Sequence, residues 1–317
     1  MKFKSFSKKT KIIAVICAVA AVIFILQCFM GLVAYNLGFT SSGKGVFGNI
    51  KNESEISQKQ ISENEKWLKE NGKTVTVTSS DGLKLSAYML TYNGVTNSYA
   101  VLCHPYNKDG ISMVEYAKHY YGLGMNVLLP DSRGHGKSEG KYYGMGFTEK
   151  EDVKAWVSYI TKNYPGARIL LHGVGMGGSA VAMASSDLPD NVRFIIDDGG
   201  FSDLETEVKY LIKDKFSLPY FPAGTIVNML YKAHTGTNMK DVSAVNELKS
   251  CEIPVLFIHA ENDEVVPVTQ GNKAFDACNG SSYQYIVNGA SYSETLSKDS
   301  KTYWNKTDTY ILKYIGL

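Results

Sequence analysis

The alternation of short β-rich runs with amphipathic stretches constrains the fold of this chain most strongly. The later runs are nearly continuous Val, Ile and Leu, as in strands that are covered on both faces. Helical patterns separate most of these later runs, which favours parallel strands joined by crossover helices. Eight runs follow one another from residue 74 onward: TVTVT, KLSAYML, YAVLCH, MNVLLP, RILLHG, VRFIID, PVLFIHA and YQYIV. The sequence therefore predicts an α/β fold around an eight-stranded, mostly parallel sheet with helices on both faces.

Two departures from this alternation add detail to the predicted domain, residues 62–317. Residues 79–82 separate the first two runs and are too few for a crossover helix, so these runs should form an antiparallel hairpin at one sheet edge. Residues 201–248 replace the alternation with aromatic and Pro-containing helical pieces. This insertion predicts a small helical lid over the carboxyl ends of the strands.

Composition excludes several classes of protein. Of the 317 residues, 44% are hydrophobic and 20% are charged, which is typical of a folded globular protein rather than a disordered one. The net charge of +2 is too small to favour binding to nucleic acid. Five cysteines do not form a complete disulfide framework, so we expect the hydrophobic core to supply the stability.

The N-terminal region contains a membrane-spanning pattern. Residues 12–35 carry no charge and are long enough to cross a hydrocarbon core of about 30 Å. Five lysines lie in the tail that precedes them, residues 1–11, and this bias places the tail in the cytoplasm. We therefore expect a single-pass anchor in the cell membrane, an extracytoplasmic domain and, from its Ser, Gly, Asn and Lys content, a linker over residues 36–61.

A cleaved signal peptide is the alternative interpretation of residues 12–35. The apolar part of such a peptide is about 7 to 15 residues long and is followed by a small-residue cleavage site. Here the apolar run is longer, and no A-x-A-like site follows it. These differences favour an anchor that is retained.

The strongest functional motif is a glycine-rich turn. Residues 173–178 read GVGMGG and lie between the β-rich run RILLHG and the helical run SAVAMASS. Strand, sharp glycine turn and helix in this order have the form of a nucleophile elbow. Its central residue is Gly175, which has no side chain with which to attack a carbonyl carbon.

From about residue 67 to residue 315 the chain resembles the α/β-hydrolase family. The resemblance is to its membrane-anchored bacterial branch, related to serine aminopeptidases and esterases, whose elbow reads Gly-x-Ser-Met-Gly-Gly. The elbow and three further segments carry the resemblance: SDGL at 80–83, DSRGHGKS at 131–138 and FTEKEDV at 147–153. It implies the α/β-hydrolase fold and a Ser-His-Asp type of site.

The resemblance also places the two remaining members of a catalytic triad. The segment 258–267, IHAENDEVVP, is similar to the one that carries the acid, and Asp263 holds that position. The segment 288–295, NGASYSET, corresponds to the histidine loop, with Tyr292 in place of histidine, and no histidine follows Glu264. A phenol with a pKa near 10 is a poor proton acceptor at neutral pH, so Asp263 has no imidazole to orient.

An oxyanion hole is built from backbone and can therefore survive these substitutions. The resemblance assigns its donors to the N–H of Met176, after the elbow centre, and to that of Tyr106, after the third strand. Pro105 stands where the family usually has glycine, and it lacks an N–H and restricts the backbone. The expected site binds a carbonyl or carboxylate without cleaving it.

Other side chains have simpler interpretations. Ser179 follows the elbow and could be a displaced nucleophile, but its position predicts core packing. Four histidines fall at strand ends or in adjacent loops, yet none forms a metal-ligand spacing such as H-x-x-x-H: His104, His135, His172 and His259. We expect these histidines to form structural hydrogen bonds and predict neither a metal nor a cofactor.

Two functions remain open at this point. The first is a pseudohydrolase that has lost the Ser and His of the triad and binds a small-molecule or peptide ligand or a partner. The second is a working esterase or peptidase that uses a non-standard nucleophile and base.

Overall fold

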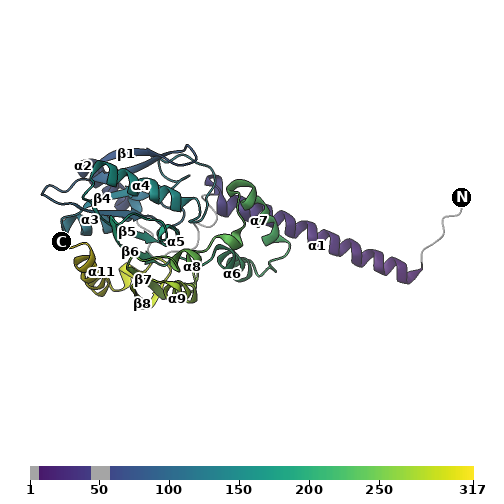
Figure 1. The fold of residues 1–317 in the computed structure, drawn as a ribbon. Coiled ribbons are helices and arrows are strands. Elements are labelled where there is room, and N and C mark those ends of the chain that lie inside the picture. Colours follow the sequence, from purple (N-terminus) through teal and green to yellow (C-terminus); the bar gives the residue numbers. More distant parts are fainter. Residues whose placement is uncertain (1–6, 44–57) are drawn as a thin grey trace.

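The structure is a computed structural model that describes residues 7–43 and 58–317. An α/β domain forms its body, and one long helix projects from the domain (Figure 1). The strands of the domain are β1 (Gly72–Thr78), β2 (Lys84–Leu90), β3 (Ser98–Cys103), β4 (Asn126–Pro130), β5 (Arg168–Val174), β6 (Val192–Asp198), β7 (Val255–Asn262) and β8 (Ser282–Ser291).

All eight predicted strands belong to one sheet, in the order β1-β2-β4-β3-β5-β6-β7-β8. The hairpin β1–β2 is antiparallel and lies at the edge, and β2 is also antiparallel to β4. Every other pair is parallel. The predicted mostly parallel α/β sheet with its edge hairpin is therefore confirmed.

Helices cover both faces of the sheet, which explains the nearly continuous apolar strands. Neighbouring residues of β5 face opposite sides, so Leu171 enters one core and Leu170 the other. The first core includes side chains of α4 (Glu149–Asn163), α5 (Met176–Ala184), α8 (Ala244–Leu248) and α9 (Val268–Ala277). The second includes side chains of α2 (Gln58–Asn71), α3 (Val114–Gly122), α10 (Thr295–Lys298) and α11 (Ser300–Tyr314).

One buried arginine joins the three segments that accompany the elbow motif. Arg133 donates to both carboxylate oxygens of Asp152 at 2.7 Å and to Asp81 at 2.8 Å. Arg133 and Asp152 are only 5% exposed, so each charge depends on its partners for solvation. The segments are therefore structural: they tie the edge hairpin, the loop after β4 and α4 together beside the sheet.

The lid region, residues 201–248, contains two long helices. These are α6 (Leu204–Phe216) and α7 (Ala223–Thr235), and a short turn and α8 follow them. Figure 1 places α6 and α7 at the end of the domain from which the long helix projects.

That long helix is α1 (Lys8–Phe39), and among the described residues it is the one helix long and apolar enough to cross a membrane. Its side chains are mostly exposed up to Met30, but Tyr35 and Phe39 are buried in the core of the domain. Residues 36–39, expected to begin a linker, thus continue the helix and pack onto the domain. Residues 44–57 of the expected linker and residues 1–6 of the expected cytoplasmic tail lie outside the described residues.

Candidate functional site

The elbow is formed as the glycine pattern predicts. Gly175 joins β5 to α5 with φ +54° and ψ −117°, a conformation that favours glycine. Two neighbours must be glycine for space, because a Cβ on Gly173 would lie 2.1 Å from the carbonyl oxygen of Gly177, and one on Gly177 2.2 Å from that of Cys103. At Gly175 itself the nearest atom to a Cβ would be 3.4 Å away, so the site has room for a small side chain.

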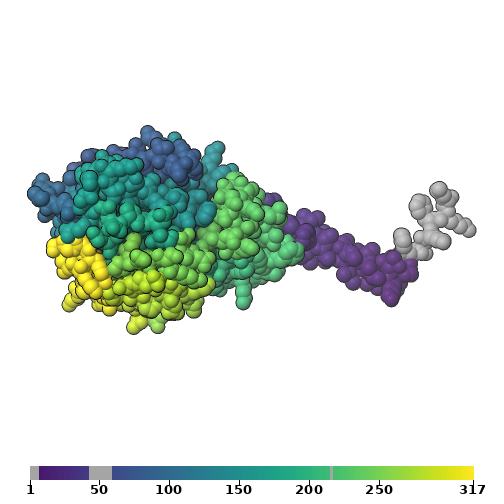
Figure 2. Space-filling view, in the orientation of Figure 1, coloured from purple at the N-terminus to yellow at the C-terminus, as the bar shows by residue number. Residues whose placement is uncertain are grey.

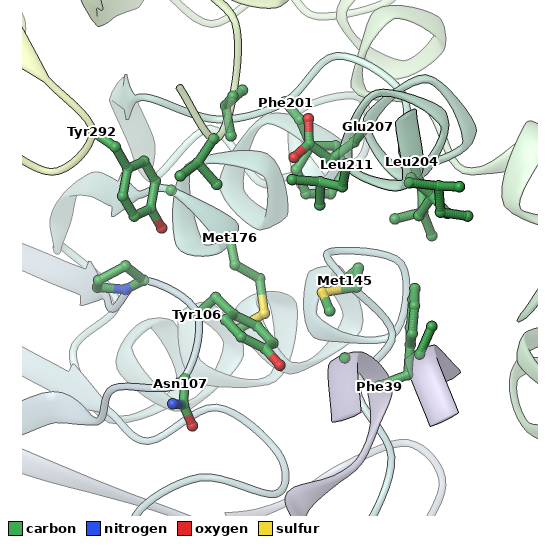
Figure 3. A pocket seen from close by; sticks show the side chains of 18 of the residues that line it. Phe39, Tyr106, Asn107, Met145, Met176, Phe201, Leu204, Glu207, Leu211 and Tyr292 are labelled. Carbon is green, nitrogen blue, oxygen red and sulfur yellow. The ribbon is translucent and has the colours of Figure 1, made fainter. Parts of the chain in front are cut away.

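Tyr292 lies directly beside the elbow centre. Its hydroxyl oxygen is 3.5 Å from the position of a Cβ on Gly175, and its ring points into the pocket next to Met176 (Figure 3). Burial, followed by the negative charge of Asp263, raises the pKa of Tyr292 above the ordinary value of a phenol. The hydroxyl therefore stays protonated at neutral pH and can donate a hydrogen bond but not act as a base.

Asp263 follows β7 and is buried, as the acid of a triad would be. One of its oxygens accepts hydrogen bonds of 2.8 Å from the N–H groups of Val265 and Val266. Its other oxygen is 3.9 Å from Nε2 of His259, but that nitrogen donates to the carbonyl oxygen of Val266 at 2.8 Å. His259 is buried and does not line the pocket, so its imidazole is not placed to act as a base there.

The two predicted oxyanion-hole residues line the same pocket as Gly175 and Tyr292. Met176 is the first residue of α5, where a backbone N–H has no acceptor within its own helix. Tyr106 follows β3, and its side-chain hydroxyl donates to the carbonyl oxygen of Leu37 in α1 at 3.2 Å. The structure thus brings both residues to the elbow, and their role as donors to a ligand stays a prediction.

The pocket is a cavity of about 160 Å³ with a largely apolar lining. Its walls come from the elbow and neighbouring loops, from α6 and α7 of the lid, and from the last turns of α1 (Figure 3). The helix α1 contributes Ala34, Gly38 and Phe39. The projecting helix is therefore part of the site, which the apolar composition of residues 12–35 did not predict.

Glu207 is the carboxyl group of this pocket, and the sequence analysis missed it. It is 5% exposed and accepts a hydrogen bond of 2.6 Å from the amide of Gln270. Burial raises the pKa of Glu207 to about 8, so the group is mostly protonated at neutral pH. Helical spacing was the available signal, because Glu207 follows Leu204 by three residues and precedes Leu211 by four, which places all three on one face.

A second carboxyl group approaches the elbow from β6. Asp198 accepts hydrogen bonds from the hydroxyls of Thr295 at 2.9 Å and Tyr303 at 2.8 Å, and lines a small cavity that also includes Asp263 and Tyr292. Burial raises the pKa of Asp198 to about 7. Its hydrogen bonds hold the loop after β8, which carries Tyr292, against the sheet.

The remaining predicted residues have structural roles. Ser179 is fully buried and its hydroxyl accepts the N–H of Phe201 at 2.8 Å, so it is not a displaced nucleophile. His172 lies between the hydroxyls of Tyr120 and Tyr303, and His104 accepts the N–H of Ser132. Residues 7–43 and 58–317 contain no cluster of side chains suited to a metal ion.

Comparison with known proteins places these features in context. The sequence profile described as "Prolyl oligopeptidase family" matches residues 113–296. The uncharacterized protein YqkD of Bacillus subtilis is 29% identical over 230 residues, which cover 72% of this chain and 75% of YqkD. An uncharacterized membrane protein of Saccharomyces cerevisiae, YNL320W, is 22% identical over 246 residues, or 75% of this chain and 79% of that protein. In fold, the chain is similar to the Pyrococcus furiosus esterase Pf2001, with a TM-score of 0.65, 21% identity and coverage of 79% of this chain and 94% of the esterase.

Proposed function

The chain belongs to the prolyl oligopeptidase family of α/β-hydrolase-fold proteins, and from this premise we propose that it is a membrane-anchored pseudohydrolase. It binds a ligand in the pocket at the elbow and does not hydrolyse it. Single-pass anchoring by residues 12–35 leaves the domain, residues 62–317, outside the cytoplasm. The fold and the comparisons establish that the chain has a hydrolase fold and, among its described residues, one apolar N-terminal helix long enough to span a membrane.

One observation carries the proposal: a protonated phenol adjoins a glycine where the reaction needs a base beside a nucleophile. Acyl transfer by a catalytic triad uses a hydroxyl or thiol that attacks and an imidazole that takes its proton. The Tyr292 hydroxyl lies 3.5 Å from the Cβ position of Gly175, where these groups would meet, but it acts as neither the nucleophile nor the base. A donor at this position suits a ligand that offers an acceptor oxygen.

The alternative, an active esterase or peptidase, needs both groups from elsewhere. The chain has six histidines, all among the described residues, and none of them lines the pocket. Ser293 lines the pocket and offers a hydroxyl. That hydroxyl is hydrogen-bonded to Tyr292, and the Tyr292 phenol does not accept a proton at neutral pH. This arrangement favours binding over turnover.

The lining indicates the chemical class of ligand. Its walls are aliphatic, aromatic and thioether side chains, while the predicted backbone donors, Tyr292 and protonated Glu207 supply hydrogen bonds near the elbow. Lys108 adds a positive charge at the rim. We expect a small molecule with an apolar body and a carbonyl or carboxylate head.

The packing of α1 supports a retained anchor over a cleaved signal peptide. Tyr35 is 3% exposed and Phe39 6% exposed, and Phe39 forms part of the pocket wall. Removal of the helix would expose this wall to water. The core and the pocket wall of the domain are therefore completed by the end of the same helix that is proposed to anchor it.

The proposal is tested with p-nitrophenyl octanoate as the probe. Native mass spectrometry of the detergent-solubilised full chain should detect one intact ester retained, and release of p-nitrophenol should not exceed that of heat-denatured protein. Leu211→Trp, which fills the pocket from α6, should abolish retention, whereas Leu312→Trp, at an exposed position of α11, should preserve it. Release of p-nitrophenol well above the denatured control would contradict the proposal. Retention of the ester that is unchanged by Leu211→Trp would contradict it as well.

A further inference from the structure

The tip of the lid lies alongside the apolar part of α1. We call residues 217–229, which connect α6 to α7 and form the first half of α7, the lid tip. The ring of Phe221 packs against that of Phe24 with centroids 6.1 Å apart, and a Cβ on Gly31 would lie 2.6 Å from the carbonyl oxygen of Ala223. Figure 2 shows the lid, in green, beside the projecting purple helix.

The contact with Phe24 places the lid tip at the depth of a membrane. An α-helix rises 1.5 Å per residue, so a hydrocarbon core of about 30 Å takes about 20 residues. A span that begins at Ile12 therefore ends near Leu32. Phe24 is then about 12 Å inside this boundary, and Phe221 lies at a similar depth.

The composition of the lid tip suits that depth. Residues 216–231 carry no charge, in a chain that is 20% charged. Phe221 is 64% exposed and Met229 is 61% exposed, so two large apolar side chains project from the lid tip outside the core.

The helix α7 begins near the edge of the hydrocarbon, and charge returns farther along it. The helices α1 and α7 run in the same direction, because Ala223 lies at Gly31 and Tyr231 contacts Phe39. The first charged residue of α7 is Lys232, about 14 Å along the helix from Ala223. Ala223, at Gly31, lies just inside the boundary near Leu32, so the loop before α7 is the part at hydrocarbon depth and the basic end of α7 lies outside it.

From these observations we propose that the lid tip inserts into the bilayer beside α1 as a second membrane contact. A helix and an inserted loop together fix the tilt of the domain, which a single spanning helix does not. The contact needs only the lid tip and α1, so it holds whether or not the pocket binds a ligand.

Insertion also has a consequence that rests on the proposed binding function. Ala34 and Val227 line the pocket, and Ala34 is one helical turn beyond Gly31. The inner wall of the pocket therefore adjoins the membrane surface. An acyl chain from a membrane lipid can reach the pocket from this side without crossing bulk water.

Tryptophan fluorescence of the full chain in lipid nanodiscs tests the insertion. Phe221→Trp and Pro219→Trp each place an indole in the exposed loop before α7, at or near the residue that contacts Phe24, and the parent chain supplies the background of the three native tryptophans. Tyr164→Trp is the matched control: Tyr164 is 38% exposed and precedes β5, so it lies at the end of the sheet opposite the elbow. Nanodiscs are prepared with and without lipids that are brominated along the acyl chain and quench nearby indoles.

We expect the emission added by each lid-tip tryptophan to be blue-shifted and to lose more than half of its intensity in brominated nanodiscs. The emission added at residue 164 should be unquenched. Lid-tip emission that resembles the control in position and quenching would overturn the proposal. Two lid-tip variants keep the test decisive if one of them fails to fold, and neither outcome depends on ligand binding.

Discussion

Replacing Gly175 with alanine tests whether the elbow retains the strained geometry of a nucleophile turn. The backbone there has φ +54° and ψ −117°, which costs a residue with a Cβ about 1 to 3 kcal/mol. The added methyl group meets no atom closer than 3.4 Å, so steric overlap adds nothing to this cost. Gly175→Ala should therefore lower the free energy of unfolding by about 1 to 3 kcal/mol through backbone strain alone.

Thermal unfolding of the full chain in nanodiscs, followed by circular dichroism, measures this loss. At about 2 to 4 °C per kcal/mol for a domain of this size, the expected decrease in Tm is about 2 to 12 °C. Gly199→Ala is a matched control for strain, since Gly199 has φ +74° and no atom within 4 Å of its Cβ position. Gly166→Ala has equal space and no left-handed φ, so it should leave the Tm unchanged or slightly higher.

The Tm values of these three variants show whether the backbone of the elbow is strained. If Gly175→Ala unfolds with the Tm of Gly166→Ala while Gly199→Ala is destabilised, the elbow is unstrained in solution. The backbone conformation of Gly175 would then not require glycine.

Three further predictions concern the groups around the pocket and the core. Glu207 has a pKa of about 8 in the folded protein against 4.5 ordinarily, so the folded state binds the proton more tightly and stability falls as pH rises from 4.5 to 8. Glu207→Gln should therefore gain Tm relative to the parent between pH 5 and pH 9, and parallel pH profiles would refute this. Arg133→Met leaves Asp152 buried without its partner and should cost about 3 to 5 kcal/mol in chemical denaturation, whereas Lys154→Ala, in a more exposed ion pair, should cost at most about 1 kcal/mol; equal losses would argue against the buried cluster. Gly175→Ser combined with Tyr292→His should create p-nitrophenyl esterase activity absent from Gly175→Ala with Tyr292→His, and no gain would indicate that the oxyanion hole is not formed.

The sheet and the elbow could be predicted from sequence because their signals are local. Strands covered on both faces need apolar side chains on both, so they appear as unbroken runs of Val, Ile and Leu. The elbow needs glycine at Gly173 and Gly177, where backbone carbonyl oxygens approach within contact distance, and this requirement fixes the spacing around Gly175. Asp263 and Tyr292 are assigned from the resemblance to the α/β-hydrolase family, and the structure brings both to the elbow.

The rest of the pocket depends on how distant segments pack. The spacing of Glu207 on α6 gives its face of the helix, but only the docking of the lid determines that this face covers the elbow. The burial of Tyr35 and Phe39 depends on α7, nearly 200 residues away in sequence, whose His234 accepts a hydrogen bond of 2.7 Å from Tyr35 or donates one to it. Composition alone treats these residues as the end of an apolar span and the start of a linker.

The absence of an activated nucleophile is the central claim, and covalent labelling tests it most directly. Full-length protein in nanodiscs is incubated with a fluorophosphonate, and intact-mass spectrometry measures the fraction of chains that gain the phosphonyl group. Because Gly175 offers no oxygen and Tyr292 is held protonated, we predict no adduct above that of heat-denatured protein. A stoichiometric adduct that forms only on the folded chain and maps to one residue of the pocket would contradict the account.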